Sequence, residues 1–199
     1  MNIRKKTILI SALVLLSTIS FWQPRLAVGQ GNLVGRTITG TVYFVGGRAS
    51  GRSLPFTLII NRLATAEEVS QLNAALQSGG QDDLLRTLSR MGSGRIQIGT
   101  GVGVPANAII ASQAEGGPKL VVLYERNLRF AELRYGTRSA DYKFGYAEIY
   151  LHGRSGEGML IPAAKVRLRN GNTWEVEDFG TFPARLMGLQ VRGGPPQPR

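Results

Sequence analysis

Six carboxylates in the C-terminal half of the chain have the side chains best suited to catalysis. Most glycosidases use two carboxyl groups that flank the scissile bond, one as an acid and the other as a base or nucleophile. The separation of two carboxylates cannot be inferred from sequence, so a carboxylate-dependent hydrolase acting on extracellular glycan is kept as an alternative and no catalytic residue is assigned. The six are Glu132, Asp141, Glu148, Glu175, Glu177 and Asp178.

His152 is the only histidine, and the chain contains no cysteine. Without thiolates, a zinc site would need carboxylates beside the imidazole, and no two acids lie at ligand spacing around it. A triad of Ser139, His152 and Asp141 can be written down, but nothing places His152 beside the other two, and such triads are defined by geometry. The sequence therefore indicates no metal and no cofactor.

Two glycine-containing stretches resemble known motifs only in part. Residues 99–103, GTGVG, lack the G-x-G-x-x-G spacing, the Lys-Ser/Thr of a phosphate loop and a following helix. Residues 153–156, GRSG, lack the strand-to-helix turn that a nucleophile elbow requires. Both stretches are predicted to be bends between strands.

An alternating aromatic stretch is the best candidate for a binding surface. In residues 141–151, DYKFGYAEIYL, a strand places four aromatic rings and Glu148 on one face and small or aliphatic residues on the other. Tyrosine offers a flat apolar face and one hydroxyl, so this face could line a groove or a barrel interior, with Arg126 or Arg134 opposite Glu148. The predicted ligand-binding residues are Tyr142, Tyr146, Glu148, Tyr150, Arg126 and Arg134.

The same stretch also has a purely structural interpretation. Aromatic residues favour strands, and cross-strand aromatic pairs stabilise sheets. An internal carboxylate needs a charged partner whether or not a ligand binds beside it. The polar loop at 136–141, GTRSAD, can be held by hydrogen bonds from Ser139 and Asp141 to its own backbone. Both interpretations stay open at this stage.

The chain is strongly basic, with a formal net charge of +11. Four basic residues lie in segment 1–29, so the remainder keeps 20 basic residues against all 13 acidic ones, a charge of +7. This charge favours anions such as acidic polysaccharide or lipid headgroups. The arginines are scattered singly along the sequence, so a solvated surface is the simpler interpretation and nucleic acid is disfavoured as a partner. The partner is unknown; an anionic envelope component or an apolar small molecule is retained.

The N-terminus has the three parts of a secretory signal peptide. A basic head at 1–6 precedes an apolar run at 7–22, and Ala27 and Gly29 supply the small residues of a cleavage site. The run is shorter than the roughly 20 residues that span a bilayer. We therefore expect cleavage before Gln30 and export to the periplasm or the cell exterior. An uncleaved N-terminal membrane anchor is the alternative.

The rest of the chain is predicted to form a single domain over residues 30–192. No linker or internal repeat interrupts it, and about 170 residues suffice for one core without disulfides. The tail at 193–199, GGPPQPR, has no apolar side chain able to pack and is predicted to be disordered.

Most of this domain has the pattern of β-strands. Residues 36–45 alternate and are rich in β-branched types, and 55–63 carry a continuous apolar run that suggests burial on both faces. Asn170-Gly171 is a strong hairpin turn signal. Seven further strands are predicted at 94–99, 107–112, 119–133, 141–151, 158–169, 173–178 and 184–191.

Between the second and third strands the pattern becomes helical. Thr65 and Glu68 have the spacing of a capping box, and Gly79-Gly80 is expected to end a first helix before a second one at about 81–91. The predicted fold is α+β and mainly antiparallel: a barrel-like or strongly bent sheet of about nine strands, with a two-helix hairpin inserted after the second strand. Four apolar residues of the hairpin should be buried against the sheet, namely Leu72, Leu76, Leu84 and Leu88.

Several quoted stretches together resemble an uncharacterised family of exported bacterial proteins. They are YERNLRFAELRYGTRSADYKFGYAEIYL, GEGMLIPAAKV and VEDFGTFPARLMGL, with TAEEVSQLNAALQSGGQDDLLRTL upstream. The resemblance covers most of the exported domain, and it implies no activity, ligand or catalytic residue. The sequence thus predicts an exported, non-enzymatic binding or envelope-associated module for an apolar or anionic ligand. The alternatives are a module that docks a protein through the helical hairpin or a sheet edge, and the hydrolase above.

Overall fold

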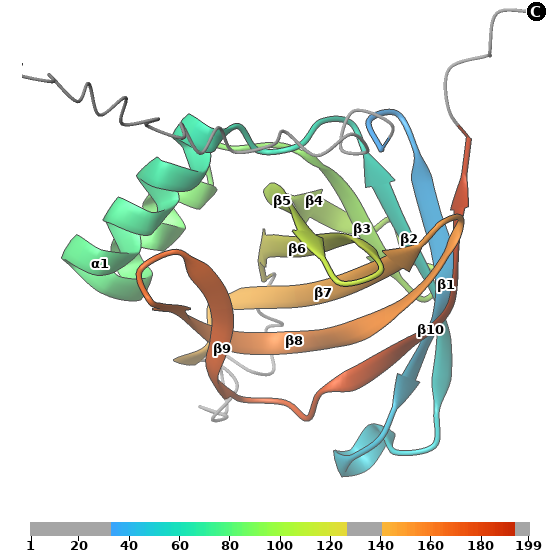
Figure 1. Cartoon of the computed structure of the whole chain (residues 1–199). Coiled ribbons are helices and arrows are strands. Elements are labelled where there is room, and N and C mark those ends of the chain that lie inside the picture. Colours follow the sequence, from blue (N-terminus) through green and yellow to red (C-terminus); the bar gives the residue numbers. More distant parts are fainter. Residues whose placement is uncertain (1–32, 127–140, 194–199) are drawn as a thin grey trace, which may run out of the picture.

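A computed structural model of the chain describes residues 33–126 and 141–193 (Figure 1). The predicted signal peptide at 1–29 and nearly all of the predicted tail lie outside the described residues, as does the stretch 127–140. That stretch contains three of the residues named above: Glu132, Arg134 and Ser139. Cleavage and export therefore stay predictions.

Within these residues, ten antiparallel strands form one sheet in the order β4-β3-β2-β1-β10-β8-β7-β6-β5, with β9 paired to β8 off this path. The nine predicted strands are present, although residues 127–133 of the strand predicted at 119–133 lie outside the described residues. Among the described strands the sequence misses only β4, a three-residue strand with a proline at its centre. The bounds are β1 (Thr37–Phe44), β2 (Ser53–Ile60), β3 (Gly94–Ile98), β4 (Val104–Ala106), β5 (Ala108–Ala114), β6 (Gly117–Glu125), β7 (Phe144–His152), β8 (Ser155–Arg169), β9 (Thr173–Phe179) and β10 (Ala184–Arg192).

The sheet curls until it is nearly closed, with one seam between its two ends (Figure 1). At the seam β4 packs beside β6, and the buried Asn107 between β4 and β5 bridges the two ends. Its amide nitrogen donates to the carbonyl oxygens of Leu88 and Met91 at 3.2 and 3.3 Å. Its amide oxygen accepts the backbone N–H of Glu125 at 2.9 Å. One side chain therefore connects the seam to β6 and to the end of the helix.

Aliphatic side chains fill the interior of this barrel-like sheet. On β2, Phe56, Leu58 and Ile60 point inward and are buried, whereas Ile59 between them is exposed. The prediction that this strand is buried on both faces is therefore wrong, because only alternate residues of its apolar run face the core. β7 contributes its small and aliphatic side to the same core, through Ala147, Ile149 and Leu151.

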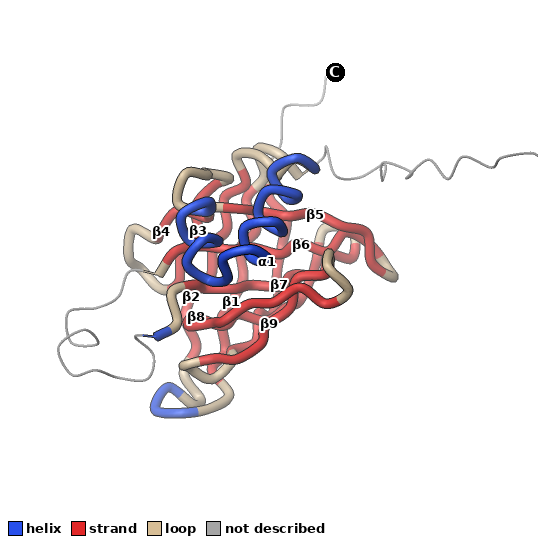
Figure 2. Tube along the Cα trace, turned by 90° about the vertical axis from the view of Figure 1, so that its left-hand side faces the viewer, coloured by secondary structure: helices blue, strands red, loops and turns tan. Residues whose placement is uncertain are grey.

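One helix, α1 (Ala66–Leu88), lies across the outside of the sheet (Figure 2). Its predicted start is confirmed: Thr65 Oγ1 accepts the N–H of Glu68 at 3.2 Å, and the Glu68 carboxylate accepts the N–H of Thr65 at 2.9 Å. The predicted two-helix hairpin is wrong, since the structure has a single helix kinked at Gly80, where φ is 64° and ψ is −149°. Glycine adopts this conformation without steric cost, so one residue redirects the helix and no connecting loop is needed.

A second core lies between α1 and the outer face of the sheet. Leu72, Leu84 and Leu88 are fully buried there and Leu76 packs at its margin, as the sequence predicts. The large side chains that meet them are Phe144, Tyr146, Ile161 and Trp174. The sheet is thus packed on both faces where the helix covers it.

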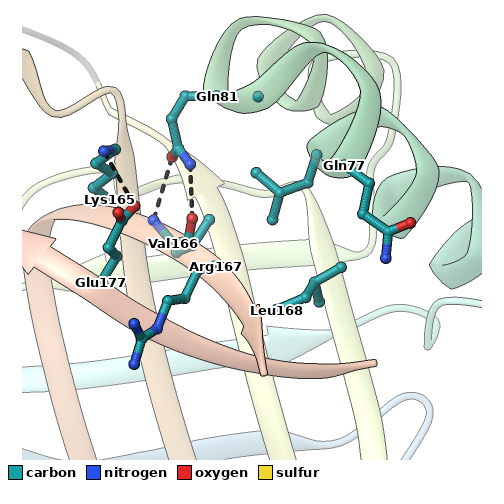
Figure 3. Close-up of a pocket in the computed structure, with 9 residues that line it drawn as sticks. Gln77, Gln81, Lys165, Val166, Arg167, Leu168 and Glu177 are labelled. Carbon is teal, nitrogen blue, oxygen red and sulfur yellow. Dashed lines mark hydrogen bonds and ion pairs between the residues drawn. The ribbon is translucent and has the colours of Figure 1, made fainter. Parts of the chain in front are cut away.

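β8 is the longest strand, and its two halves have different neighbours. The first half lies between β7 and β10, and the second half pairs with β9 through a turn in which Asn170 and Gly171 both have positive φ. β7 begins opposite Ala164, so the backbone of Val166 has no strand on that side. The side chain of Gln81 takes this place: Nε2 donates to the Val166 carbonyl at 2.7 Å, and Oε1 accepts its N–H at 3.2 Å (Figure 3).

Candidate functional site

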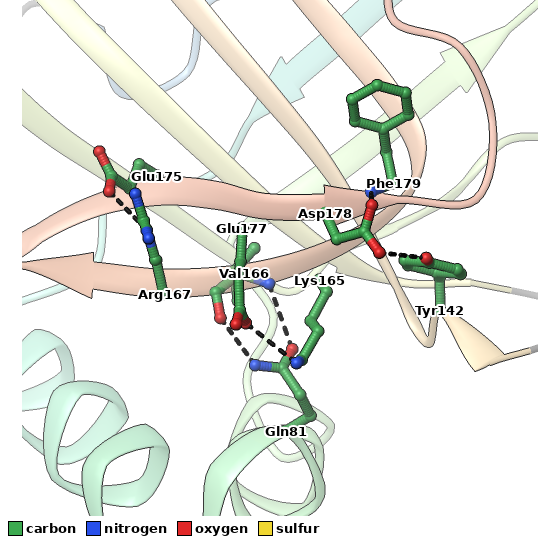
Figure 4. Close-up of polar contacts among 9 residues, drawn as sticks. All are labelled: Gln81, Tyr142, Lys165, Val166, Arg167, Glu175, Glu177, Asp178 and Phe179. Carbon is green, nitrogen blue, oxygen red and sulfur yellow. Dashed lines mark hydrogen bonds and ion pairs between the residues drawn. The ribbon is translucent and has the colours of Figure 1, made fainter.

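The aromatic face of β7 lies outside the barrel, and it does not line the interior. Phe144 and Tyr146 are fully buried in the second core, whereas Tyr150 at the other end of the strand is partly open to solvent. Tyr142, just before the strand, donates its hydroxyl to Asp178 Oδ2 at 2.6 Å (Figure 4). The predicted binding residues therefore divide into a buried part and one accessible end.

Glu148 is at the centre of a polar cluster on this face. The Tyr146 hydroxyl donates to Oε2 at 2.5 Å, the Tyr150 hydroxyl donates to Oε1, and Lys119 Nζ lies 2.9 Å from Oε1. The Lys119 ammonium is also 5.3 Å from the centroid of the Tyr150 ring. Glu148 itself is only 8% exposed. We call Lys119, Tyr146, Glu148 and Tyr150 the Glu148 cluster.

The cluster holds its carboxylate in the ionised form. Burial raises the pKa of Glu148, but hydrogen bonds from Lys119, Tyr146 and Tyr150 together lower it further, so the pKa lies below its usual range. Burial lowers the pKa of Lys119, but its bond to Glu148 outweighs this and the pKa is raised. Burial, then the bond to Glu148, raise the pKa of Tyr146, which keeps its hydroxyl a donor. A fully bonded, ionised carboxylate is a poor general acid, because such an acid must carry a proton near neutral pH.

The charged partner of Glu148 differs from the predicted one. Lys119 on β6 stands opposite Tyr150 on β7, and this register brings its ammonium to the carboxylate. Arg126 instead donates to the Tyr142 carbonyl oxygen at 2.7 Å, at the far end of the same strand pair. The other predicted partner, Arg134, lies outside the described residues.

The accessible end of the cluster borders a groove of about 450 Å³ on the outer face of β7, β8 and β10. The register forms a row across it, with Glu148 opposite Met159 and Met159 opposite Arg185. β10 carries an extra residue against both neighbours near Gly188, whose φ is 60°, and this bulge presents Met187 to solvent. The groove residues used below are Tyr150, Glu157, Met159, Arg185 and Met187.

Arg185 is the cation in this groove that is available to a ligand. Its side chain is exposed, and within the described part of the chain its guanidinium forms neither an ion pair nor a hydrogen bond. By contrast, Nε of Arg167 on β8 forms an ion pair with Oε1 of Glu175 at 2.6 Å. An unpaired guanidinium can bind a carboxylate or phosphate through two parallel hydrogen bonds. Sequence reasoning missed Arg185, because only the strand order places it next to Met159.

A second groove, of about 390 Å³, lies between α1 and the second half of β8 (Figure 3). Its polar side chains already have partners. Gln81 holds the β8 backbone, Gln77 Nε2 donates to the Gly171 carbonyl at 3.3 Å, and Lys165 lies 3.1 Å from Glu177. We interpret this groove as the joint between the helix and the β8–β9 hairpin.

The carboxylates predicted for hydrolysis do not form an unpaired couple where the structure describes them. Glu175 and Glu177 form ion pairs with basic side chains of β8, and Asp178 accepts the Tyr142 hydroxyl (Figure 4). Asp141 is exposed on the segment before β7, and Glu148 is held in its cluster. At the described positions, each of these carboxylates except Asp141 therefore already has a hydrogen-bond or ion-pair partner.

The remaining motifs behave as bends. Residues 99–103 form the turn between β3 and β4. In the stretch 153–156, Gly153 and Arg154 form the turn between β7 and β8, whereas Ser155 and Gly156 begin β8. His152 is exposed at the end of β7. Among the described residues, no group of three His, Asp or Glu side chains is arranged to hold a metal ion.

No family model, curated protein or solved structure matches this chain. Within the described ranges, no helix combines the length and the apolar character needed to cross a membrane.

Proposed function

We propose that this protein is a non-enzymatic binding module whose ligand is an amphipathic anion. One observation carries the proposal: the Arg185 guanidinium, which has no ion pair or hydrogen bond among the described residues, stands in a groove beside Met159 and Met187, which are 36% and 50% exposed. The ligand would place a carboxylate or phosphate on Arg185 and an apolar body on the two methionines.

The chemistry of the groove fits such a ligand. Methionine is flexible and polarizable, so it accommodates apolar groups of irregular shape. The volume of about 450 Å³ lies within the range of about 300–1,000 Å³ that small-molecule sites span. Glu157 lines the groove opposite Tyr150 and repels an anion, which leaves Arg185 as the favoured position for the headgroup.

The Glu148 cluster supports this groove as a rigid wall. The carboxylate fixes the Tyr150 hydroxyl and the Lys119 ammonium, so the Tyr150 ring at the groove edge has one orientation. Preorganised side chains lose less conformational entropy when a ligand binds. Glu148 therefore acts by positioning Tyr150, and it is not itself the group that binds the ligand.

The sequence-based alternatives have less support than this groove. The groove beside α1 has internally paired charges, which leaves little for a docking partner to bind. A hydrolase would need a protonated carboxyl group, whereas the pKa of Glu148 is lowered. The predicted signal peptide and the resemblance to exported bacterial proteins support a location in the cell envelope.

The test is calorimetric titration with dodecyl phosphate below its micelle-forming concentration. Arg185→Ala should weaken binding at least about tenfold, because a hydrogen bond to a charged group contributes about 1.5–3 kcal/mol. Arg90→Ala is the matched control, since Arg90 is also an exposed arginine but does not line the groove, and it should bind as the unsubstituted protein does. Equal affinity of the two variants, or no binding by the unsubstituted protein, would refute the proposal.

A further inference from the structure

The sheet divides into one part that contains acidic residues and one that does not. β4, β3, β2, β1 and β10 are consecutive in the sheet, and these strands and the β1–β2 and β3–β4 turns hold no Asp or Glu. Every acidic residue in the described ranges belongs to α1 or to the other strands and their connections. The acid-free part contains arginines on its strands and turns, among them Arg52, Arg95, Arg185 and Arg192.

One end of the acid-free part carries exposed apolar side chains. The β1–β2 turn, with the short helix η2 (Gly47–Ala49), lies beside the loop at 180–183, because Phe44 pairs with Ala184 (Figure 1). Phe182 in that loop is 59% exposed, and Val45 is 49% exposed. Arg52 is exposed at the start of β2. We call Val45, Arg52 and Phe182 the apolar tip.

The Phe182 ring packs against two glycines of the β1–β2 turn. A Cβ atom on Gly46 would lie 2.8 Å from the Phe182 ring, and one on Gly47 would lie 3.1 Å from it. The ring therefore rests directly on the backbone of the β1–β2 turn. Both loops form one surface, with an aromatic ring held toward solvent.

We propose that the apolar tip docks this protein on an anionic lipid surface. Phe182 and Val45 would enter the interface between headgroups and acyl chains, and Arg52 would contact lipid phosphates. Anionic leaflets attract basic residues within about a Debye length of the surface. Neither this part of the sheet nor the loop at 180–183 contains Asp or Glu, so the tip itself presents no negative charge that an anionic surface would repel.

A bilayer fits the tip better than a second copy of the chain or a nucleic acid. Two copies paired through their tips would bring like charges together, which opposes association. A nucleic acid would interact with the arginine but would leave the exposed Phe182 and Val45 without an apolar partner. The tip is also distinct from the groove, because Val45, Arg52 and Phe182 do not line it. This inference therefore goes beyond the proposed function and can fail separately from it.

A fluorophore at the tip tests the proposal directly. The chain has no cysteine, so Ser50→Cys in the β1–β2 turn gives a unique site for an environment-sensitive NBD label. Ser89→Cys gives the control label near the opposite end of β2. Ser89 lies shortly before Ser93 in the sequence, and the Ser93 carbonyl oxygen accepts the N–H of Asn61, the residue that follows β2. Both exposed serines are labelled in the full chain, which is then mixed with vesicles of phosphatidylcholine, alone or with equimolar phosphatidylglycerol.

We expect the emission of the Ser50 label to rise and shift to the blue with the anionic vesicles, and this change to decrease with added salt. The Ser89 label should not change. The apolar run at 7–22 is present in both labelled proteins, so vesicle binding through it alone would not distinguish them. An unchanged Ser50 label, or an equal change of both labels, would overturn the proposal. So would a blue shift without vesicles that grows with protein concentration, which would assign the tip to a second copy.

Substitutions test which residues of the apolar tip contribute to vesicle binding. Phe182→Ser should reduce the affinity for anionic vesicles about tenfold, because it removes a large apolar side chain from the interface. Arg52→Ala should reduce it about fivefold, as expected for one basic residue at an anionic surface. Val34→Ser is the matched control, because Val34 is 40% exposed and precedes β1 at the end away from Val45. An equal loss in the Val34 variant, or no loss in either tip variant, would overturn the proposal.

Discussion

At the scale of single residues, burial of the Glu148 charge has a desolvation cost that its neighbours must offset. A buried carboxylate is tolerated only when hydrogen-bond donors and an opposite charge surround it. Here two donors come from the same strand face, at Tyr146 and Tyr150, and the charge comes from Lys119 on the neighbouring strand. The three groups satisfy the carboxylate, so its main effect is on stability and on the orientation of Tyr150.

Replacing the charge while keeping the shape tests this role. Glu148→Gln should lower the free energy of unfolding by about 3 kcal/mol, near the lower end of the range for broken buried ion pairs. The loss is moderated because the Lys119 side chain is 19% exposed and can turn to water. Glu177→Gln is the matched control: its pair with Lys165 is exposed, so it should cost less than about 1 kcal/mol. Urea unfolding at pH 7 measures both.

The pH dependence of the stability of Glu148→Gln provides a second test of this role. The folded state lowers the pKa of Glu148, so its stabilisation is present above the ordinary value of 4.5 and is lost as the pH falls through the folded pKa. The stability difference between the unsubstituted protein and Glu148→Gln should therefore shrink in acid. A variant of undiminished stability that no longer binds the ligand would contradict this account and make Glu148 a ligand-contacting residue.

Sequence reasoning recovered part of this site. The alternation of 142–150 correctly placed the aromatic rings and Glu148 on one face and the aliphatic residues on the other. It did not identify Lys119, because a long segment joins β6 to β7 and no short turn fixes which residues of the two strands stand opposite each other. It also could not identify Arg185, which depends on β10 lying next to β8.

At the scale of elements, the seam of the sheet depends on Asn107. Its side chain satisfies backbone groups of the helix end and of β6 in a place where no strand can pair with both. Nothing in the sequence marks this residue, because an asparagine between two strands is also a common turn signal. β4 was also missed, because three residues are too few for an alternating pattern to be detected.

Asn107→Ala should therefore destabilise the protein by about 2–3 kcal/mol, because it leaves buried backbone groups without partners. Hydrogen exchange of the Glu125 amide should also accelerate, since Asn107 is its acceptor. Asn172→Ala in the exposed β8–β9 turn is the control and should change stability by less than about 0.5 kcal/mol. Slow exchange at Glu125 in the Asn107 variant would mean that the seam is held by other contacts.

The helix shows which structural features can be predicted from residues that are close together in the sequence. The capping box and the apolar stripe were both predictable, since each depends on residues within a few positions. The relation between the two parts of the helix was not predictable, because a Gly-Gly pair can end a helix or kink it. In the structure Gly80 takes a positive φ and α1 continues to Leu88, where it meets Asn107.

At the scale of the whole molecule, the strand order creates a charge distribution that the sequence conceals. The arginines are single and widely spaced along the chain, which favoured a simple solvated surface. The pairing of β1 with β10 brings the first and last strands together, and with them two long stretches without acidic residues. The antiparallel, barrel-like class was predictable from strand spacing, whereas strand order required long-range pairing that spacing does not reveal.

The most direct test of the proposed function is methyl NMR of the methionines. Met159 and Met187 line the groove, whereas Met91 packs in the second core and serves as an internal reference. During titration with dodecyl phosphate, the account predicts saturable shifts of the Met159 and Met187 methyl signals, a stationary Met91 signal, and loss of the shifts in Arg185→Ala. Stationary signals from both groove methionines, or the same shifts in the Arg185 variant, would contradict it.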